Sequence, residues 1–468
     1  GHITWSMDAL PPQATAAFAA LLGARFDQSP PARDAHATDA SHHAARPPLA
    51  VAYPTSVDEI SAIARLCTAY KVPLIPFGTG TAVEGGIVAV HGGLTVDLSR
   101  LNRILAINTA DMDATVEAGV TRNQLNDHLK AQNTGLHFPV DPGADASLGG
   151  MAATRASGSA AVGYGTMRDN VLGLKAVFAD GAIVEVGGRA RKSSAGYDLT
   201  RLLVGSEGTL ALIAEVSLKL SRIPTAVSAA VCPFADIDAA IAAAIATLCQ
   251  GIPVARLEFL DEVQMAACNQ YSQLSYPEAP TLFFEFHGSD AAVVAQAEAA
   301  AEIVARHGGG PFRWATAQGE RDRLWQARYD AYHACRALRP GATGYVTDVC
   351  VPITALAHCI RETRVIVQDL DFPAPLFGHV GDGNYHVVCI IEPGNEGELA
   401  QVKDLGAQLV DLALQAGGTC TGEHGIGLGK IAALEKECGP AVEIMRKVKN
   451  ALDPDYLMNP GKVLRHTP

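Results

Sequence analysis

The sequence lacks several features that mark common classes of protein. Its ten cysteines include no CxxC pair, which argues against an iron–sulfur cluster or a disulfide framework and predicts reduced thiols in a cytoplasmic-type compartment. No uninterrupted apolar run is long enough to span a bilayer, so no transmembrane segment is expected. Basic blocks are absent and the net charge is −13, so nucleic acid is not an expected partner.

The chain is long enough for more than one domain. Its 468 residues exceed the size at which a single core stops growing, and 48% of them are hydrophobic. The letters "GHITWS" before Met7 are typical of an expression scar. His36, His42 and His43 lie in the Pro/Ala-rich stretch "SPPARDAHATDASHHAARPP", which predicts a solvated loop rather than a metal site. Changes of pattern predict four parts: residues 1–46 (the scar and an N-terminal extension), 47–222, 223–415 and 416–468.

Helices and strands alternate along most of the chain. "TSVDEISAIARLCTAYKVP" predicts a helix that begins at a capping box of Ser56 and Glu59, and "ADIDAAIAAAIATLCQG" predicts an amphipathic helix. "VPLIPF", "GGLTVDLSRL", "TLFFEFHG" and "YHVVCII" have the character of strands. This alternation predicts an α/β or α+β fold.

Three glycine-rich segments in the first half of the chain predict a bound cofactor. "PFGTGTAVEGG" (76–86) follows a strand, and its glycines allow successive N–H groups to surround a diphosphate. The segment departs from GxGxxG, which would need glycine at Val83, and no GxxxxGKS/T occurs. "DPGADASLGGMAATRASGSAAVGYGTMRDNV" (141–171) is too polar and kinked for a helix or strand, and "VGSEGTLALI" (204–213) is a third glycine-rich turn. A flat ring system with a diphosphate would cover this exposed backbone.

"FGHVGDGNYHVV" (377–388) places two histidines on either side of a tight turn. A turn centred on Asp382-Gly383 predicts a hairpin in which His379 faces His386. Directly opposed side chains have Cβ atoms roughly 5 Å apart, close enough for both imidazoles to reach one metal ion. A one-residue bulge would break this register. The alternative is a polar hairpin lined by two hydrogen-bonded histidines.

Together, these motifs resemble one flavoprotein family. The resemblance is carried, in chain order over residues 47–465, by "GTGT", "EGG", "DPGADASLGGMAAT", "YGTMRDNV", "GSEGTL", "GHVGDGN", "GEHGIG" and "NPGK". They are similar to the vanillyl-alcohol-oxidase/PCMH-type flavoproteins, and within these to the D-lactate dehydrogenase (cytochrome) and glycolate-oxidase-subunit-D group. The resemblance implies an α+β fold: a PCMH-type FAD-binding domain, a second, ferredoxin-like substrate or cap domain, and a C-terminal segment that returns to the flavin and completes the active site.

The resemblance also implies which residues bind FAD. The cofactor should be non-covalent, because "GTGTAVEGG" offers no histidine or cysteine as a tether. The residues implied around the diphosphate are Pro76, Gly78, Thr79, Gly80, Thr81, Gly85 and Gly86. Those implied along the flavin and ribityl chain are Pro142, Gly143, Ser147, Leu148, Gly149, Ala153, Ser157 and Gly158. Those implied at the adenosine end are Glu207, Gly208 and Ile213, and Asn459 would lie near the isoalloxazine.

A metal-assisted reaction is implied as well. His379 and His386, with Glu423 from "CTGEHGIG" (420–427), would form a His₂-carboxylate set with open positions, as expected of a catalytic Zn²⁺ or Mn²⁺ ion. His424, next to this ligand, is the candidate base, since imidazole exchanges protons near neutral pH. Arg328 in "RLWQARYDAY" matches the family's substrate arginine and would bind a carboxylate bidentately.

The reaction that the resemblance implies is oxidation of a D-2-hydroxy acid, most of all D-lactate to pyruvate, by hydride transfer to FAD N5. Thr347 stands near the position where relatives that oxidise D-2-hydroxyglutarate carry lysine, which favours a monocarboxylic substrate; glycolate or D-2-hydroxyglutarate is the alternative. Trp325 and Tyr332 either line the side-chain pocket or belong to the core. Electrons would pass to a cytochrome, a quinone or an electron-transfer flavoprotein, and a homodimer is compatible with the resemblance.

We expect a cytoplasmic location, or one peripheral to the inner membrane. The sequence leaves two other classes of function open. In a flavin-free metallohydrolase, His379, His386 and Glu423 would activate water and the glycine segments would be ordinary turns. The third possibility is a non-catalytic subunit of a larger dehydrogenase.

Overall fold

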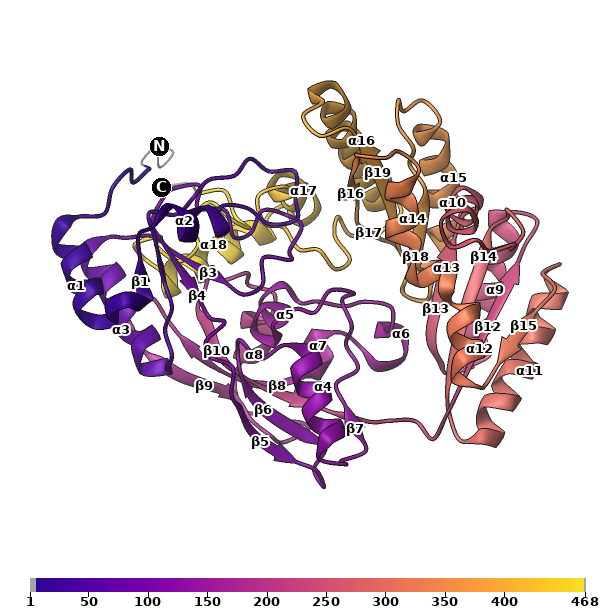
Figure 1. The fold of residues 1–468 in the computed structure, drawn as a ribbon, viewed down its shortest axis with the longest axis horizontal. Helices are drawn as coiled ribbons and strands as arrows, with labels where there is room; N and C mark the ends of the chain where they lie inside the picture. Colours follow the sequence, from indigo (N-terminus) through magenta and orange to yellow (C-terminus); the bar gives the residue numbers. More distant parts are fainter. Residues whose placement is uncertain (1–5, 467–468) are drawn as a thin grey trace. The chain divides into compact units, whose positions relative to one another are not determined.

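The computed structural model describes residues 6–466, and the chain divides into two units (Figure 1). The first unit contains the chain up to Gly158, the segment Gly165–Ile223 and the chain from Glu423 onward. The second contains Ser159–Tyr164 and Pro224–Gly422, so it is inserted into the first along the sequence. Residues 1–5 of the predicted expression scar lie outside the described residues.

The first unit contains two larger sheets. One has the strand order β1-β2-β4-β3, in which β2, β4 and β3 are parallel. The helices α1 and α3 pack on it around Phe18, Ile60 and Leu74, which are fully buried. The elements of this part are α1 (Pro12–Leu22), η1 (Gly23–Arg25), β1 (Phe26–Asp27), α2 (Pro30–Ala35), β2 (Ala50–Ala52), α3 (Val57–Tyr70), β3 (Leu74–Phe77) and β4 (Leu94–Asp97).

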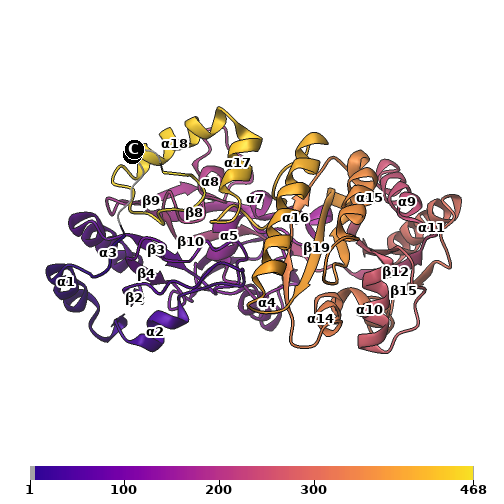
Figure 2. The same cartoon turned by 90° about the horizontal axis from the view of Figure 1, so that it is seen from above.

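The other large sheet of this unit is antiparallel, with the order β5-β6-β10-β8-β9. Leu125 and Met151, from α4 and α5, belong to its core, and Val448 and Leu452 of α18 pack against that core. The C-terminal helices, yellow in Figure 2, are therefore part of this unit. The remaining elements are β5 (Ile104–Asn108), β6 (Asp113–Glu117), α4 (Arg122–Ala131), β7 (Leu136–His137), α5 (Leu148–Thr154), α7 (Met167–Asn170), β8 (Val171–Val177), β9 (Ile183–Gly187), α8 (Leu199–Leu203), β10 (Leu212–Lys219), β11 (Ser221–Arg222), α17 (Ile431–Cys438) and α18 (Ala441–Leu452).

The second unit is built on one antiparallel sheet with helices on both faces. Its strand order is β15-β12-β14-β13-β18-β19-β16, and β17 also pairs with β19. Phe284 points to the face covered by α9, α11, α15 and α16, and its neighbour Phe283 to the face covered by α10, α12, α13 and α14. None of the helices within residues 6–466 combines the length and apolar character needed to cross a membrane.

The elements of the second unit are α6 (Ala161–Tyr164), β12 (Ala226–Pro233), α9 (Ile237–Cys249), β13 (Val254–Leu260), α10 (Glu262–Ser272), β14 (Thr281–Gly288), α11 (Asp290–Arg306), β15 (Arg313–Ala315), α12 (Gln318–Leu324), α13 (Gln326–Tyr329), α14 (Ala331–Ala337), β16 (Thr343–Val346), β17 (Val349–Cys350), η2 (Ile353–Ala355), α15 (Leu356–Val367), β18 (Leu376–His379), η3 (Val380–Asp382), β19 (Asn384–Ile391) and α16 (Glu396–Gln415).

Two helices form where the sequence predicts them. The Ser56 hydroxyl accepts the N–H of Glu59 at 3.2 Å at the start of α3, and Asp236 caps α9. The capping box of α3 is only half formed, because the Glu59 carboxylate accepts the N–H of Thr55 at 2.7 Å and pairs with Arg25. With the two units, these elements confirm the predicted α+β fold class.

The prediction that residues 141–171 form neither helix nor strand is wrong, because α5, α6 and α7 lie there. The side chain of Ser147 caps α5, and that of Thr166 caps α7. Close packing overrides the poor helix propensity of glycine. A Cβ on Gly149 would lie 2.5 Å from the Cβ of Ala118, so only glycine allows α5 to approach this strand end.

The predicted register of the histidine hairpin is also wrong. The turn η3 and Gly383, which has a φ of 79°, join β18 to β19, and His379 pairs with Asn384 rather than with His386. The register is thus displaced by two residues. Because side chains alternate with a period of two, the displacement keeps both histidines on one face, with ring centroids 5.4 Å apart.

His36 departs from the predicted solvated loop. It follows α2 and is buried, with Nδ1 bonded to the Ala32 carbonyl at 2.7 Å and Nε2 to the Asp97 carboxylate at 2.8 Å. Burial alone would lower the pKa of His36, but the bonds to Asp97 and Ala32 raise it above its usual value. His36 therefore fastens the N-terminal extension to β4, whereas His42 and His43 are partly exposed.

Candidate functional site

A cavity of about 250 Å³ in the first unit is lined by all three predicted glycine segments. The sequence-predicted FAD-binding residues that line it are Pro76, Gly78, Thr79, Gly80, Thr81, Gly86, Pro142, Ser147, Gly149, Ala153, Ser157, Glu207, Gly208, Ile213 and Asn459. The predicted residues outside this lining are Gly85, Gly143, Leu148 and Gly158. Leu148 belongs instead to the fully buried core.

Glycine is needed in this wall because the loops approach one another closely. A Cβ on Gly78 would lie 2.5 Å from the Ser147 Oγ. A Cβ on Gly208, whose φ is +73°, would lie 2.5 Å from the Pro76 Cγ. These contacts bring the end of β3, the start of α5 and the turn before β10 to one place. The resulting wall consists of backbone and small side chains, which suits a flat ring and a diphosphate.

Asn459 connects the C-terminal segment to two loops of this wall. It is buried, and its Nδ2 donates to the carbonyls of Gly86 at 2.9 Å and Glu207 at 2.8 Å. Its own N–H donates to the Leu74 carbonyl at 2.7 Å, and Lys462 Nζ donates to its Oδ1 at 2.8 Å. A φ of 43° is unusual for a residue with a side chain, and these bonds hold it there.

The Glu207 carboxylate fastens a second part of the C-terminal segment. Its oxygens accept the N–H groups of Gly427 at 3.0 Å and Ile426 at 3.1 Å, which holds the "GEHGIG" turn against the "GSEGTL" turn. Burial raises the pKa of Glu207, against the opposing effect of these bonds and of Lys462. Burial also lowers the pKa of Lys462 to about 7.

The predicted metal ligand Glu423 and the predicted base His424 line the same cavity. Glu423 Oε2 also accepts the N–H of Gly158 at 3.0 Å. The two residues precede Gly425, whose φ of 84° turns the chain sharply. The predicted base and the predicted FAD-binding segments are therefore walls of one pocket within the first unit.

In the second unit, each predicted histidine ligand is oriented through its Nδ1. His379 Nδ1 bonds both Glu258 oxygens, at 2.8 and 2.9 Å, and His386 Nδ1 bonds the Thr347 carbonyl at 2.7 Å. Since a carbonyl only accepts, the proton of a neutral His386 lies on Nδ1 and the lone pair on Nε2. Metal-ligating histidines are almost always held by such a bond.

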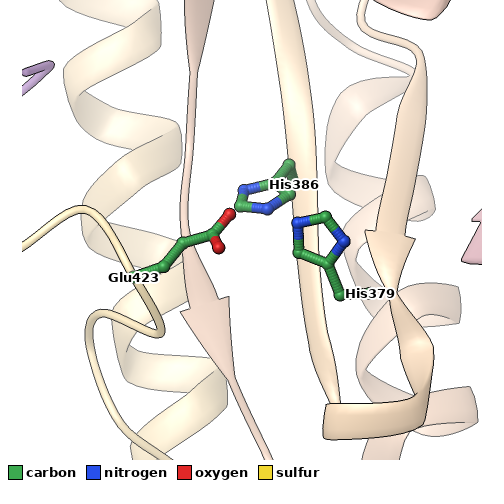
Figure 3. Close-up of side chains that lie close together, drawn as sticks. All are labelled: His379, His386 and Glu423. Carbon is green, nitrogen blue, oxygen red and sulfur yellow. The ribbon is translucent and has the colours of Figure 1, made fainter. Parts of the chain in front are cut away.

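Glu423 directly follows a loop that is anchored in the second unit. Asp348 is buried, and its carboxylate accepts the Thr421 hydroxyl and the Gly422 N–H, both at 2.9 Å. Within residues 6–466, one group of at least three side chains meets the geometry of a metal site. Its ligand atoms lie within 4.8 Å of one another and come from His379, His386 and Glu423 (Figure 3). Two imidazoles and a carboxylate suit Zn²⁺ or Mn²⁺.

Arg328 lies beside His379, one of the predicted ligands, and both are bonded to Glu258. Its Nε donates to Glu258 Oε1 at 3.0 Å, and its Nη2 lies 2.9 Å from the same oxygen in an ion pair. Its guanidinium lies over the Phe377 ring, 5.1 Å from the centroid. The Nε edge is thus occupied. Bidentate binding of a substrate carboxylate would use the edge formed by the two terminal nitrogens.

The other residues considered from the sequence have different positions. Trp325 is 1% exposed and donates to the Phe284 carbonyl at 3.2 Å, so it belongs to the core. Tyr332 is 38% exposed and donates to the Gly344 carbonyl. The Thr347 hydroxyl accepts the N–H of Val387 at 2.9 Å, so both its side chain and its carbonyl serve the neighbouring strand β19.

Sequence reasoning missed Glu258 and Asp348, the two buried carboxylates that hold the ligand-bearing segments. A signal for Glu258 was available. "VARLEFL" is an apolar strand with one carboxylate between Leu257 and Phe259, and a buried charge requires partners. Its partners Arg328 and His379 are distant in the sequence, so they could not be named from it.

Comparisons with known proteins identify the class to which this protein belongs. A family model described as FAD binding domain matches residues 48–187, and one described as FAD linked oxidases, C-terminal domain, matches residues 223–463. With the glycine-lined cavity, these matches define a flavin-dependent oxidoreductase. The chain belongs to the FAD-linked oxidases of the PCMH-type flavoprotein family, as the motifs predict. The flavin-free metallohydrolase is thereby set aside.

Individual relatives agree with this family. The chain is 49% identical over 439 residues to a Danio rerio protein described as probable D-lactate dehydrogenase, mitochondrial, covering 93% of this chain and 88% of the relative. It is 44% identical over 424 residues to the D-lactate dehydrogenase (cytochrome), mitochondrial, of Arabidopsis thaliana, covering 90% and 74%. The solved structure of 4-ethylphenol oxidase from Gulosibacter chungangensis has the same fold, with a TM-score of 0.80, 17% identity and coverage of 98% and 99%.

Proposed function

We propose that this enzyme oxidises a D-2-hydroxy acid, D-lactate to pyruvate, with FAD in the glycine-lined cavity and a divalent ion at His379, His386 and Glu423. The observation that carries the proposal is the double position of Glu423. It lines the cavity and also offers a carboxylate oxygen to the histidine group. The descriptions of the Danio rerio and Arabidopsis thaliana relatives support D-lactate as the substrate.

The cavity wall suits FAD without a covalent link. The segment Gly78–Gly86 presents backbone and threonine hydroxyls, and it contains no histidine or cysteine to which the flavin could be tethered. Bound there, FAD supplies the acceptor for the hydride that leaves the substrate Cα. Asn459 and Glu207 hold the surrounding loops, so the pocket is pre-formed for the cofactor.

The metal ligands leave coordination positions open for the substrate. A divalent ion, when bound, lowers the pKa of a coordinated hydroxyl group. His424 then accepts the hydroxyl proton, and the free edge of Arg328 binds the carboxylate of the substrate. The substrate loses one proton and one hydride, so its C–O single bond becomes the carbonyl of the 2-oxo acid.

A cytochrome is the electron acceptor that we propose, because the description of the Arabidopsis thaliana relative names one. Oxidation of one substrate molecule releases two electrons, so a one-electron carrier would be needed twice per turnover. The predicted cytoplasmic location stays a prediction, since both named relatives are described as mitochondrial.

The test is anaerobic reduction of the flavin in the purified protein. Addition of D-lactate should bleach the flavin absorption band, and pyruvate should form in a one-to-one ratio with the flavin reduced. L-lactate serves as the stereochemical control, and glycolate and D-2-hydroxyglutarate as rival substrates. A flavin that stays oxidised with D-lactate, or that is bleached faster by D-2-hydroxyglutarate, contradicts the proposed substrate.

A further inference from the structure

We propose that Glu258 is a positioning residue that holds one metal ligand and the substrate-binding arginine in a fixed arrangement. The inference rests on the proposed function, because it concerns the roles given there to His379 and Arg328. According to this inference, the buried Glu258 carboxylate increases the affinity for the metal ion and helps Arg328 to bind the carboxylate of the substrate.

Glu258 lies in the middle of β13 and is fully buried. Its Oε1 is hydrogen-bonded to Arg328 Nε at 3.0 Å and to His379 Nδ1 at 2.8 Å, and lies 2.9 Å from Arg328 Nη2 in an ion pair. Its Oε2 lies 2.9 Å from the same His379 nitrogen. One carboxylate therefore contacts side chains from β18 and from α13, two elements far apart in the sequence.

A carboxylate at this position is tolerated only because it is paired. Its oxygens are hydrogen-bonded to Arg328 Nε and His379 Nδ1, and these partners compensate for the burial of the charge. Removing the charge would leave the Arg328 guanidinium without its counter-ion, with the face of the Phe377 ring as its remaining neighbour here. The position of residue 258 therefore requires a carboxylate, because only a charged acceptor satisfies both Arg328 and His379.

For His379, the bond to Glu258 keeps the proton of a neutral ring on Nδ1. The lone pair then lies on Nε2, the nitrogen required for metal ligation, and the ring cannot rotate away. For Arg328, the bond engages Nε and leaves the terminal edge for the substrate carboxylate. Since both bonds converge on one oxygen, Glu258 sets the separation between the metal ligand and the carboxylate-binding group.

The neighbouring strand β14 offers a matched control in Glu285. This carboxylate also joins a histidine and an arginine, with His287 Nε2 at 2.9 Å and Arg256 Nε at 3.3 Å. Its side chain is 12% exposed. The Glu285 group repeats the chemistry of the Glu258 group but contains none of the proposed ligands.

The experiment compares Glu258→Gln and Glu285→Gln with the wild type, each as the FAD-loaded, chelator-treated protein. Isothermal titration with Mn²⁺ should give a roughly 10- to 100-fold weaker affinity for Glu258→Gln, as for other residues that support a metal ligand. Saturating Mn²⁺ should restore kcat of this variant, while KM for D-lactate stays raised because Arg328 is misplaced. Glu285→Gln should match the wild type in Mn²⁺ affinity and KM.

Wild-type Mn²⁺ affinity and KM in Glu258→Gln would overturn the inference and leave the proposed function intact. Failure of the wild type itself to bind Mn²⁺ or Zn²⁺ would overturn the proposed metal and this inference with it. If Glu258→Gln does not fold, Glu258→Asp replaces it, because aspartate keeps the charge but is too short to reach both partners. Folded Glu258→Asp with wild-type Mn²⁺ affinity and KM would equally overturn the inference.

Discussion

Glu423 and His424 are consecutive residues with separate tasks in the proposed site. The Glu423 carboxylate accepts the N–H of Gly158 and completes the ligand group of His379 and His386. His424 lines the cavity and is no member of that group. Removal of its imidazole should therefore affect proton transfer while the cofactor and the ion remain bound.

Replacement of His424 by alanine should slow flavin reduction by D-lactate roughly 10²- to 10⁴-fold, the usual contribution of a general base. The FAD content of the purified protein should stay at the wild-type level. Stopped-flow absorbance under anaerobic conditions measures the rate. His358→Ala, which removes an exposed histidine from α15, is the matched control. A wild-type rate of flavin reduction in His424→Ala would exclude His424 as the base.

At the scale of single residues, sequence motifs identify the candidate site residues, but they do not identify the residues that orient those side chains. His379 and His386 flank a glycine-rich turn and Glu423 stands within one, so their motifs are visible from the sequence. Glu258 and Asp348 act through contacts with residues distant in the sequence, and only the folded chain brings these partners together.

The C-terminal segment, the yellow part of Figure 2 from Glu423 onward, is the element that closes the cofactor pocket. Met458 forms a parallel bridge with Leu74 of β3, which extends the four-stranded sheet by one short pairing. Asn459 follows at once and bonds the loops at Gly86 and Glu207. The position of the pocket wall therefore depends on this pairing.

Asn459→Ala should weaken FAD binding at least about tenfold. The carbonyls of Gly86 and Glu207 would lose their donor, and a buried group left unsatisfied costs about 1–3 kcal/mol. Fluorescence titration of the apoprotein with FAD measures the affinity. Ser56→Ala is the control, since loss of the α3 cap costs about 1 kcal/mol of folding stability at a site outside the cavity lining. Equal FAD affinity in the two variants would contradict the role of Asn459.

Helices and strands that have capping residues and apolar periodicity can be predicted from the sequence. Those that form because of packing against distant residues cannot. The helices α3 and α9 have capping residues and apolar periodicity, and both form as predicted. The helix α5 contains two glycines in its first turn and forms because it packs against Ala118. The hairpin register depends on η3, a turn that the letters Asp-Gly alone do not specify.

On the scale of the whole molecule, the ligands of the proposed ion come from two segments that are distant in the sequence, the β18–β19 hairpin and the loop at Glu423. His379 and His386 belong to the sheet of the second unit, and Glu423 follows its last residue, Gly422. The FAD-binding segments contain none of the histidine ligands. Loss of the ion should therefore leave the cofactor in place.

Chelator treatment followed by buffer exchange should abolish reduction of the flavin by D-lactate without releasing FAD. Added Mn²⁺ or Zn²⁺ should restore the reaction, because the ligand set of two imidazoles and a carboxylate suits either ion. Metal analysis of the treated protein and its flavin spectrum are the controls. Full activity in protein shown to be metal-free would contradict the proposed role of the ion.

The insertion of one unit into the other has a consequence for how the protein is made. During synthesis on the ribosome, β3 and the glycine loops emerge early, but Met458 and Asn459 emerge only after the entire second unit has been translated. The strands of both larger sheets of the first unit end at or before Lys219, but the bridge between Leu74 and Met458 can form only after the whole of the second unit has been translated. We therefore expect the flavin to be loaded only after Asn459 has left the ribosome.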